Sequence, residues 1–201
     1  STPTVLLTVE LSDAIGGIAI TASHNPPEWN AMKFVDADGM FLSAEKAEAF
    51  LSRVNEPTQW MDWRFMGRLS KDQEAVHRHI ERILAIPYLD VATIQARKFK
   101  VVIDSVNGAG SVISPILLHK LGCEVIEINS DPTGIFAHPA EPLNHNLKQL
   151  EDAVALHKAD LGFATDPDVD RLSIVSDQGK CIGEELSVVL AEMFVLPKKP
   201  G

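Results

Sequence analysis

The sequence predicts an α/β fold with mostly parallel sheets flanked by helices, made of one complete doubly wound domain and the C-terminal part of a similar preceding domain. Three observations lead to this prediction. From residue 72 onward, short apolar runs alternate with segments of helical periodicity. Such alternation favours parallel strands joined by helical crossovers, in a sheet covered on both faces. Similar elements occur before residue 55, and the stretch between, residues 55–70, has no clean period.

The first section opens with a predicted helix. Pro3 begins a segment whose apolar residues suit one helical face, and Gly16 and Gly17 are able to end it. These apolar residues are Val5, Leu6, Val9, Ala14 and Ile15. The short apolar run 17–20 then predicts a strand, which ends because the polar, proline-containing loop 21–27 cannot continue it.

A second strand and a helix complete this section. Residues 32–35 predict the strand, and Asp36-Ala37-Asp38-Gly39 predicts a turn. Ser43 is a candidate N-cap for a helix that runs to about Asn55.

The second section contains the complete alternation. Apolar spacing and a closing Pro87 predict a helix over residues 72–86. The elements predicted after it are a strand at 100–104, a helix at 111–121, a strand at 123–128, a helix at 147–158, a strand at 161–164, and an edge hairpin of 172–175 and 181–182 around the turn 177–180. The aperiodic stretch places a domain boundary near residue 70, which divides the chain into residues 1–70 and 71–201.

The composition disfavours some classes of protein. The formal net charge is −10 and no basic run occurs, which argues against nucleic acid as a partner. No apolar run is long enough to span a bilayer and no signal peptide opens the chain, so we expect no membrane partner. Cys123 and Cys181 lack the spacing of a zinc site and are too few for a disulfide framework, which favours a reducing, cytoplasmic location.

The most distinctive pattern is Asp166-Pro167-Asp168-Val169-Asp170-Arg171, directly after the predicted strand 161–164. Three carboxylates so close together repel one another unless a cation lies among them, and oxygen ligands suit a hard ion such as Mg²⁺. Arg171 stands where an EF-hand needs Gly, which excludes that motif. A solvated acidic turn remains an alternative. So does the Asp-x-Asp nucleophile of a haloacid-dehalogenase phosphatase, although Asp170 departs from its usual Thr or Val.

Loop 21–27 carries Ser23 just after a strand, a placement that suits a nucleophile or a phosphate carrier. His24 and Lys33 could supply proton transfer or positive charge, but ordinary capping and surface roles explain each residue taken alone. Asn107-Gly108-Ala109-Gly110 suggests a dinucleotide site, yet the third glycine of that fingerprint would fall at Ile113. A tight strand-to-helix turn explains these glycines adequately.

Taken together, loops 21–27 and 166–171 resemble the phosphoserine loop and the metal loop of the α-D-phosphohexomutase family of phosphoglucomutases, phosphomannomutases and phosphoglucosamine mutases. Both motifs occur in the family's order. Further similar segments are Ser1-Thr2-Pro3-Thr4, Asp104-Ser105-Val106-Asn107-Gly108-Ala109-Gly110 and Asp177-Gln178-Gly179, so the likeness spans nearly the whole chain. Asn30-Ala31 departs from the Asn-Gly of many members and, with Trp29, resembles the phosphoglucosamine mutases.

The resemblance implies roles for individual residues. Ser23 would carry the phosphate, Lys33 would transfer protons, and His24 and Arg171 would line the catalytic site. The implied Mg²⁺ ligands are Ser23, Asp166, Asp168 and Asp170. Because the family has four domains, residues 1–70 would be the C-terminal part of domain I, and residues 71–201 would be domain II with the start of the connection to domain III.

The implied reaction interconverts hexose 1-phosphate and hexose 6-phosphate. Phosphoserine would donate to a hexose or hexosamine monophosphate, and the resulting bisphosphate would return its other phosphate. A Mg²⁺-dependent phosphatase with an Asp nucleophile and a non-catalytic phosphate-binding or metal-binding α/β domain remain the alternatives.

We expect the 201 residues alone to fold at least in their second half, to bind Mg²⁺ weakly and to lack mutase activity, with a first section that is mobile or self-associates.

Overall fold

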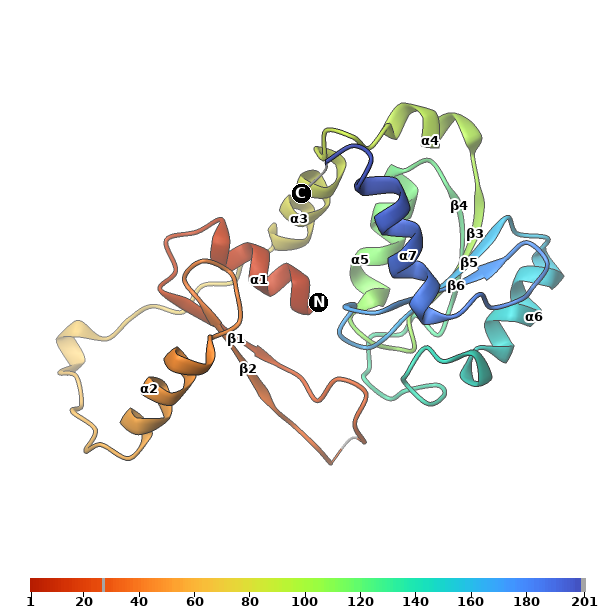
Figure 1. The fold of residues 1–201 in the computed structure, drawn as a ribbon. Coiled ribbons are helices and arrows are strands. Elements are labelled where there is room, and N and C mark those ends of the chain that lie inside the picture. Colours follow the sequence, from red (N-terminus) through yellow and green to blue (C-terminus); the bar gives the residue numbers. More distant parts are fainter. Residues whose placement is uncertain (27, 200–201) are drawn as a thin grey trace.

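The computed structural model of the chain describes residues 1–26 and 28–199 (Figure 1). Pro27, the last residue of the predicted Ser23 loop, and the final residues Pro200 and Gly201 lie outside the described residues. The elements of the first section are α1 (Thr2–Glu10), β1 (Gly16–Ile20), β2 (Met32–Asp36), α2 (Ala44–Val54) and the short 3-10 helix η1 (Trp63–Phe65). The α/β character predicted for this section is confirmed.

The first helix ends earlier than predicted. α1 stops at Glu10, so residues 14–15 do not extend its apolar face. Ser12 lies in the turn that follows, and its hydroxyl donates to Val9 O at 3.3 Å. The chain then returns as β1, where Gly17 packs so closely on the helix that a Cβ there would lie 2.5 Å from the Val9 side chain. Gly17 therefore allows a close approach within a strand and does not end the helix.

β1 and β2 pair antiparallel, with Gly16 opposite Asp36 and Ile20 opposite Met32. The mostly parallel arrangement therefore does not extend to this two-stranded sheet. Figure 1 shows the two strands reaching from α1 toward the loops that border the other sheet. Ser43 caps α2 as predicted, because its hydroxyl accepts a hydrogen bond from the amide three residues on at 3.3 Å.

The second section forms a four-stranded sheet in the order β4-β3-β5-β6. Its elements are α3 (Ala75–Leu84), α4 (Val91–Arg97), β3 (Lys100–Asp104), α5 (Gly110–Lys120), β4 (Glu124–Ile128), η2 (Asn144–Asn146), α6 (Lys148–His157), β5 (Leu161–Thr165), β6 (Leu172–Ser176) and α7 (Glu184–Val195). β3 pairs parallel with both β4 and β5, and β6 is an antiparallel edge strand. The predicted mostly parallel sheet is confirmed here.

Alternate residues of β3 face two separate cores. Val102 is fully buried among the apolar side chains of α6, which include Leu150 and Val154. Val101 and Ile103 point the other way, toward α5. Each such side chain contributes about 1.5–3 kcal/mol when fully buried. Helices thus cover both faces of the sheet, as the alternation predicted, with α6 on one face and α5 and α7 on the other (Figure 1).

Two helices of the structure, α4 and α7, were not predicted from the sequence patterns. α7 is apolar around most of its circumference, so it has no polar face by which periodicity could reveal it. α4 is short and is defined mainly by Asp90, whose carboxylate accepts from the Thr93 amide at the helix start. The predicted edge hairpin is present: β6 is its first arm, and Val175 pairs with Cys181 in an antiparallel bridge.

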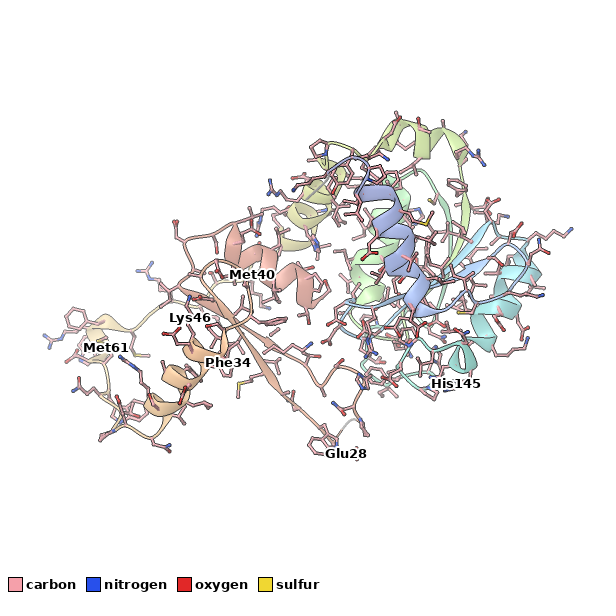
Figure 2. All side chains as sticks on the ribbon, viewed as in Figure 1. Glu28, Phe34, Met40, Lys46, Met61 and His145 are labelled. Carbon is pink, nitrogen blue, oxygen red and sulfur yellow. The ribbon has the colours of Figure 1, made fainter. Side chains whose placement is uncertain are left out.

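Apolar side chains of the stretch 55–70 are exposed. They are Trp60, Met61, Trp63, Phe65, Met66 and Leu69. Figure 2 shows Met61 at the end of the molecule away from the four-stranded sheet. Within residues 1–26 and 28–199, no helix combines the length and apolar character needed to cross a membrane.

Candidate active site

Two loops that are distant in the sequence meet beside the carboxyl edge of the four-stranded sheet. Loop 21–31 joins β1 to β2, and loop 166–171 follows β5. The Thr21 hydroxyl donates to Asp168 Oδ1, and Lys33 Nζ lies 2.6 Å from Asp168 Oδ2. The same ammonium group lies 3.6 Å from Asp170 Oδ2. The structure therefore brings together the two motifs that the sequence singled out separately.

Ser23 is held in a left-handed backbone conformation, with φ +52°. Its amide donates to Thr21 Oγ1 at 3.0 Å, and its hydroxyl lies 3.3 Å from His24 Nδ1. A left-handed serine is uncommon and marks a backbone fixed by its surroundings. Sequence reasoning gave Thr21 no role of its own, although it holds both the Ser23 backbone and Asp168. Its place in the loop beside Ser23 was the only available signal.

Asp166 is completely buried. Its Oδ1 accepts hydrogen bonds from the amides of Asp170 at 3.0 Å and Arg171 at 3.2 Å. Its Oδ2 has no hydrogen-bond partner among the described residues. Burial, and then the nearby charge of Asp170, raise the pKa of the Asp166 carboxyl to about 6. The ionised form of Asp166 therefore lacks enough neighbouring positive charge to offset its burial.

Lys33 compensates the two neighbouring carboxylates, Asp168 and Asp170. Burial alone would lower the pKa of the Lys33 ammonium group, but the hydrogen bond to Asp168 and the charges of Asp168 and Asp170 outweigh it and raise the pKa. Lys33 is therefore a cation in this arrangement.

The residues fit a hard divalent cation. All the predicted ligands offer oxygen atoms, and the buried Asp166 Oδ2 is free to accept one more interaction. Among the residues that the structure describes, however, no three Asp, Glu, His or Cys side chains already enclose an ion. Asp168 and Asp170 face Lys33 instead. The carboxylates would bind a cation by exchanging that contact.

Loop 166–171 packs closely against the backbone of the glycine turn 107–110. Val169 adopts a left-handed conformation, with φ +64°, a strained state for a β-branched residue. The Ala109 amide donates to Pro167 O at 3.0 Å. A Cβ added at Gly108 would lie 2.7 Å from Pro167 Cα. The glycine turn that suggested a dinucleotide site therefore packs against loop 166–171.

His24 and Arg171, predicted to line the site, are in contact with each other. Arg171 Nη2 lies 2.7 Å from His24 Nδ1, and Arg171 Nε lies 3.9 Å from Asp166 Oδ2. Glu141 joins them: its Oε1 is 3.4 Å from His24 Nε2 and 3.3 Å from Arg171 Nη1. No sequence motif pointed to Glu141.

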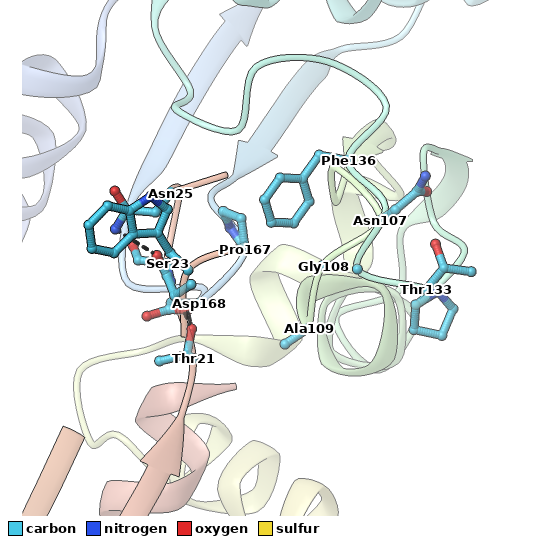
Figure 3. A pocket seen from close by; sticks show the side chains of 14 residues that line it. Thr21, Ser23, Asn25, Asn107, Gly108, Ala109, Thr133, Phe136, Pro167 and Asp168 are labelled. Atoms are coloured by element: carbon cyan, nitrogen blue, oxygen red, sulfur yellow. Dashed lines mark hydrogen bonds between the residues drawn. The ribbon is translucent and has the colours of Figure 1, made fainter. Parts of the chain in front are cut away.

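A pocket of about 470 Å³ opens beside Ser23. Figure 3 shows Thr21, Ser23, Asn25 and Asp168 on one side of it and Asn107, Thr133 and Phe136 on the other. The loops that follow β3, β4 and β5 all contribute to its lining, which places the pocket at the carboxyl ends of the parallel strands, where open α/β sheets commonly bind ligands. The cavity thus offers the Ser23 hydroxyl and the Asp168 carboxylate, and Lys33 links Asp168 to Asp170.

Comparison with known proteins gives consistent results. Residues 1–60 match the family model described as phosphoglucomutase/phosphomannomutase, alpha/beta/alpha domain I, and residues 77–179 match the model of alpha/beta/alpha domain II. A protein of Methanopyrus kandleri named probable phosphoglucosamine mutase is 36% identical over 202 residues, which cover 100% of this chain and 44% of the relative.

Two further similarities agree. A probable phosphoglucosamine mutase of Pyrococcus abyssi is 40% identical over 199 residues, covering 98% of this chain and 42% of the relative. A crystal structure from Thermus thermophilus, described as a putative phosphomannomutase, superposes with a TM-score of 0.84 at 26% identity and covers 98% of this chain and 45% of that one. The chain thus spans less than half the length of the curated relatives it matches.

Proposed function

Because this chain belongs to the phosphoglucomutase/phosphomannomutase family, we propose that it carries the phosphoserine and metal loops of an enzyme that moves a phosphoryl group between two hydroxyls of a hexose or hexosamine phosphate. The observation that carries the proposal is the contact between the two loops. Thr21 binds both the Ser23 amide and Asp168, so the hydroxyl and the carboxylates keep one relative position. Phosphoryl transfer depends mainly on such positioning and on electrostatic stabilisation.

In the proposed first step, a free hydroxyl of the sugar phosphate attacks the phosphorus atom carried by Ser23. The bond between phosphorus and Ser23 Oγ breaks, a bond to the sugar oxygen forms, and the hydroxyl proton ends on Ser23 Oγ. In the second step the bisphosphate presents its other phosphate to Ser23, and the same exchange runs in reverse. The serine is phosphorylated again and the sugar keeps one phosphate, so atoms and charge balance.

The chain's own residues would support these steps. His24 lies beside the Ser23 hydroxyl and Arg171 contacts His24, so its guanidinium would stabilise the oxygens of a phosphate on Ser23. Lys33 would move the proton, which requires it to leave the carboxylates that it contacts in this structure. Asp166, Asp168 and Asp170, together with Ser23, would hold Mg²⁺. When bound, a divalent cation would offset the charge of the phosphate and carboxylates.

The candidate substrates follow from the names of the similar proteins. The Methanopyrus and Pyrococcus relatives are named as phosphoglucosamine mutases and the Thermus protein as a phosphomannomutase. We therefore propose glucosamine, glucose and mannose phosphates as the candidates. The domain division near residue 70 and a cytoplasmic location remain predictions.

The test uses the whole protein that contains this chain. It would be incubated with hexose 1,6-bisphosphate and Mg²⁺, and the site of phosphorylation mapped by mass spectrometry. We expect phosphate on Ser23, no phosphate in Ser23→Ala, and turnover of at least one of the three sugar phosphates. Full mutase turnover by Ser23→Ala would overturn the proposal.

The same experiment separates the alternatives. A phosphatase acting through Asp168 would give an acyl phosphate on that aspartate and release inorganic phosphate. A non-catalytic binding domain would give no phosphorylated residue. The 201-residue chain assayed alone with the same three sugars should show no turnover, since it spans less than half of its relatives.

A further inference from the structure

We propose that Glu141 is a positioning residue that holds His24 and Arg171 in place beside Ser23. One carboxylate oxygen serves both partners. Glu141 Oε1 lies 3.3 Å from Arg171 Nη1 and 3.4 Å from His24 Nε2. The catalytic part of the inference depends on the proposed function, whereas the structural part does not.

Glu141 comes from a well-anchored backbone. Its carbonyl oxygen accepts from the Asn146 side chain at 2.9 Å and from the Leu143 amide at 2.8 Å. The next residue, Pro142, is fully buried, and its carbonyl accepts from the Ser173 hydroxyl of β6 at 2.5 Å. The carboxylate is therefore presented by a segment tied to the sheet, as a positioning residue requires.

The contacts determine where the ring proton of His24 lies. An arginine is always a donor, so the 2.7 Å contact from Arg171 Nη2 makes His24 Nδ1 an acceptor. The proton of the neutral ring is then on Nε2, which faces the Glu141 carboxylate. The same Nδ1 atom lies 3.3 Å from the Ser23 hydroxyl. Glu141 thus stabilises the tautomer in which Nδ1, the nitrogen beside Ser23, accepts a hydrogen bond from Arg171.

Arg171 needs the same carboxylate for its orientation. Its Nε lies 3.9 Å from Asp166 Oδ2 and 3.9 Å from Glu184 Oε1, so both contacts are longer than its contact with Glu141. Without Glu141, these two carboxylates would compete for the guanidinium. The Nη groups would then turn away from His24 and Ser23.

The structural test uses the whole protein that contains this chain, with ¹⁵N-labelled histidine and arginine. NMR shifts of the His24 ring nitrogens report which nitrogen carries the proton. We expect Nδ1 to show an acceptor shift in the unaltered chain, and both ring shifts to move toward their mutual average in Glu141→Ala. Glu141→Gln, which keeps an acceptor oxygen without the charge, should move them less.

Glu184→Gln is the matched control, because Glu184 approaches Arg171 and has no contact with His24. Its His24 shifts should stay as in the unaltered chain. If the His24 shifts stay unchanged in Glu141→Ala and Glu141→Gln, as they should in the control, the proposed positioning role is contradicted. Circular dichroism on each variant checks that the fold is kept, and Glu141→Gln preserves the test should Glu141→Ala not fold.

The catalytic test uses the whole protein. Glu141→Ala should lower kcat about 10-fold to 100-fold, the usual effect of removing a group that orients a site residue, and change KM by less than about threefold. Glu141→Gln should recover part of kcat. A loss confined to KM would overturn the inference. Absence of mutase activity in every form would instead contradict the proposed function, while the NMR result would still decide the positioning role.

Discussion

Lys33 Nζ lies 2.6 Å from Asp168 Oδ2, although 135 residues separate the two in the sequence. The contact joins β2 to the loop after β5, and Asp168 is only 3% exposed. The Lys33 ammonium group thus compensates the charge of a buried carboxylate.

Replacing Lys33 should therefore destabilise the metal-free chain. We expect Lys33→Met to lower the free energy of unfolding by about 1–3 kcal/mol, because it leaves Asp168 buried without its cation. Urea unfolding in the presence of EDTA measures this. Lys46→Met is the control, because Lys46 pairs with Asp36 on the surface and its loss should matter less. Equal stabilities of the two variants would show that Lys33 does not compensate Asp168.

Asp166→Asn should stabilise the metal-free chain above pH 6. The pKa of Asp166 is raised from 3.8 to about 6 in the folded chain, so ionising it costs stability as pH rises through this range. Two pKa units correspond to about 3 kcal/mol, and we expect a gain of about 1–3 kcal/mol at pH 7.5. Below about pH 3 the difference should vanish, because the carboxyl is then neutral in both the folded and the unfolded chain.

The same variant tests metal binding. Mg²⁺ should raise the melting temperature of the unaltered chain and not that of Asp166→Asn, which lacks the charged oxygen. Titration calorimetry on the double variant Asp166→Asn/Asp168→Asn provides the second measurement. Heats equal to those of the unaltered chain would contradict a Mg²⁺ site on these aspartates.

Gly108→Ala should displace loop 166–171. The new methyl group would lie 2.7 Å from Pro167 Cα and 3.1 Å from Pro167 O, and backbone atoms cannot yield as a flexible side chain does. We expect a loss of about 1–3 kcal/mol, typical of overpacking, and weaker Mg²⁺ binding. Gly67→Ala is a matched control, because nothing lies within 4 Å of a Cβ there. Similar unfolding curves for both variants would argue against this packing role.

His138 should make stability depend on pH. Its Nε2 lies 3.0 Å from Asp104 Oδ2 and its Nδ1 lies 2.9 Å from Pro139 O, so both nitrogens face acceptors and the ring is protonated. The hydrogen bond to Asp104 is the main cause that raises the pKa of His138 above 6.5.

Because the pKa of His138 is raised, protonation of this ring stabilises the folded chain. The stabilisation is fully present below pH 6.5 and is lost as pH rises through the pKa of the folded chain. Urea unfolding between pH 5.5 and pH 9 should therefore show a fall in stability that His138→Gln removes. The exposed His145 (Figure 2) supplies the control, and His145→Gln should keep the fall. An unchanged pH profile in His138→Gln would refute the assignment.

Local signals in the sequence predicted much of the fold. The Ser43 cap and the buried strand at β3 depend on hydrogen bonds and burial within a few residues, which a pattern can express. The early end of α1 was missed because residues 14–15 lead into β1, whose Gly17 packs against Val9 only once the chain has folded back. α7 was missed because an apolar run without a polar face has no readable period.

The sequence by itself determined the order of the elements, the two chemical motifs and the family resemblance, because each is written in neighbouring residues. Only the tertiary structure decided that Lys33 and Thr21 meet Asp168 and that Glu141 joins His24 to Arg171. It also decided that Asp166 is buried with one oxygen that accepts no hydrogen bond from the described residues. The physical reason is that these contacts balance charge and hydrogen bonding between loops far apart in the chain. Contacts between loops set those distances, and no local spacing encodes them.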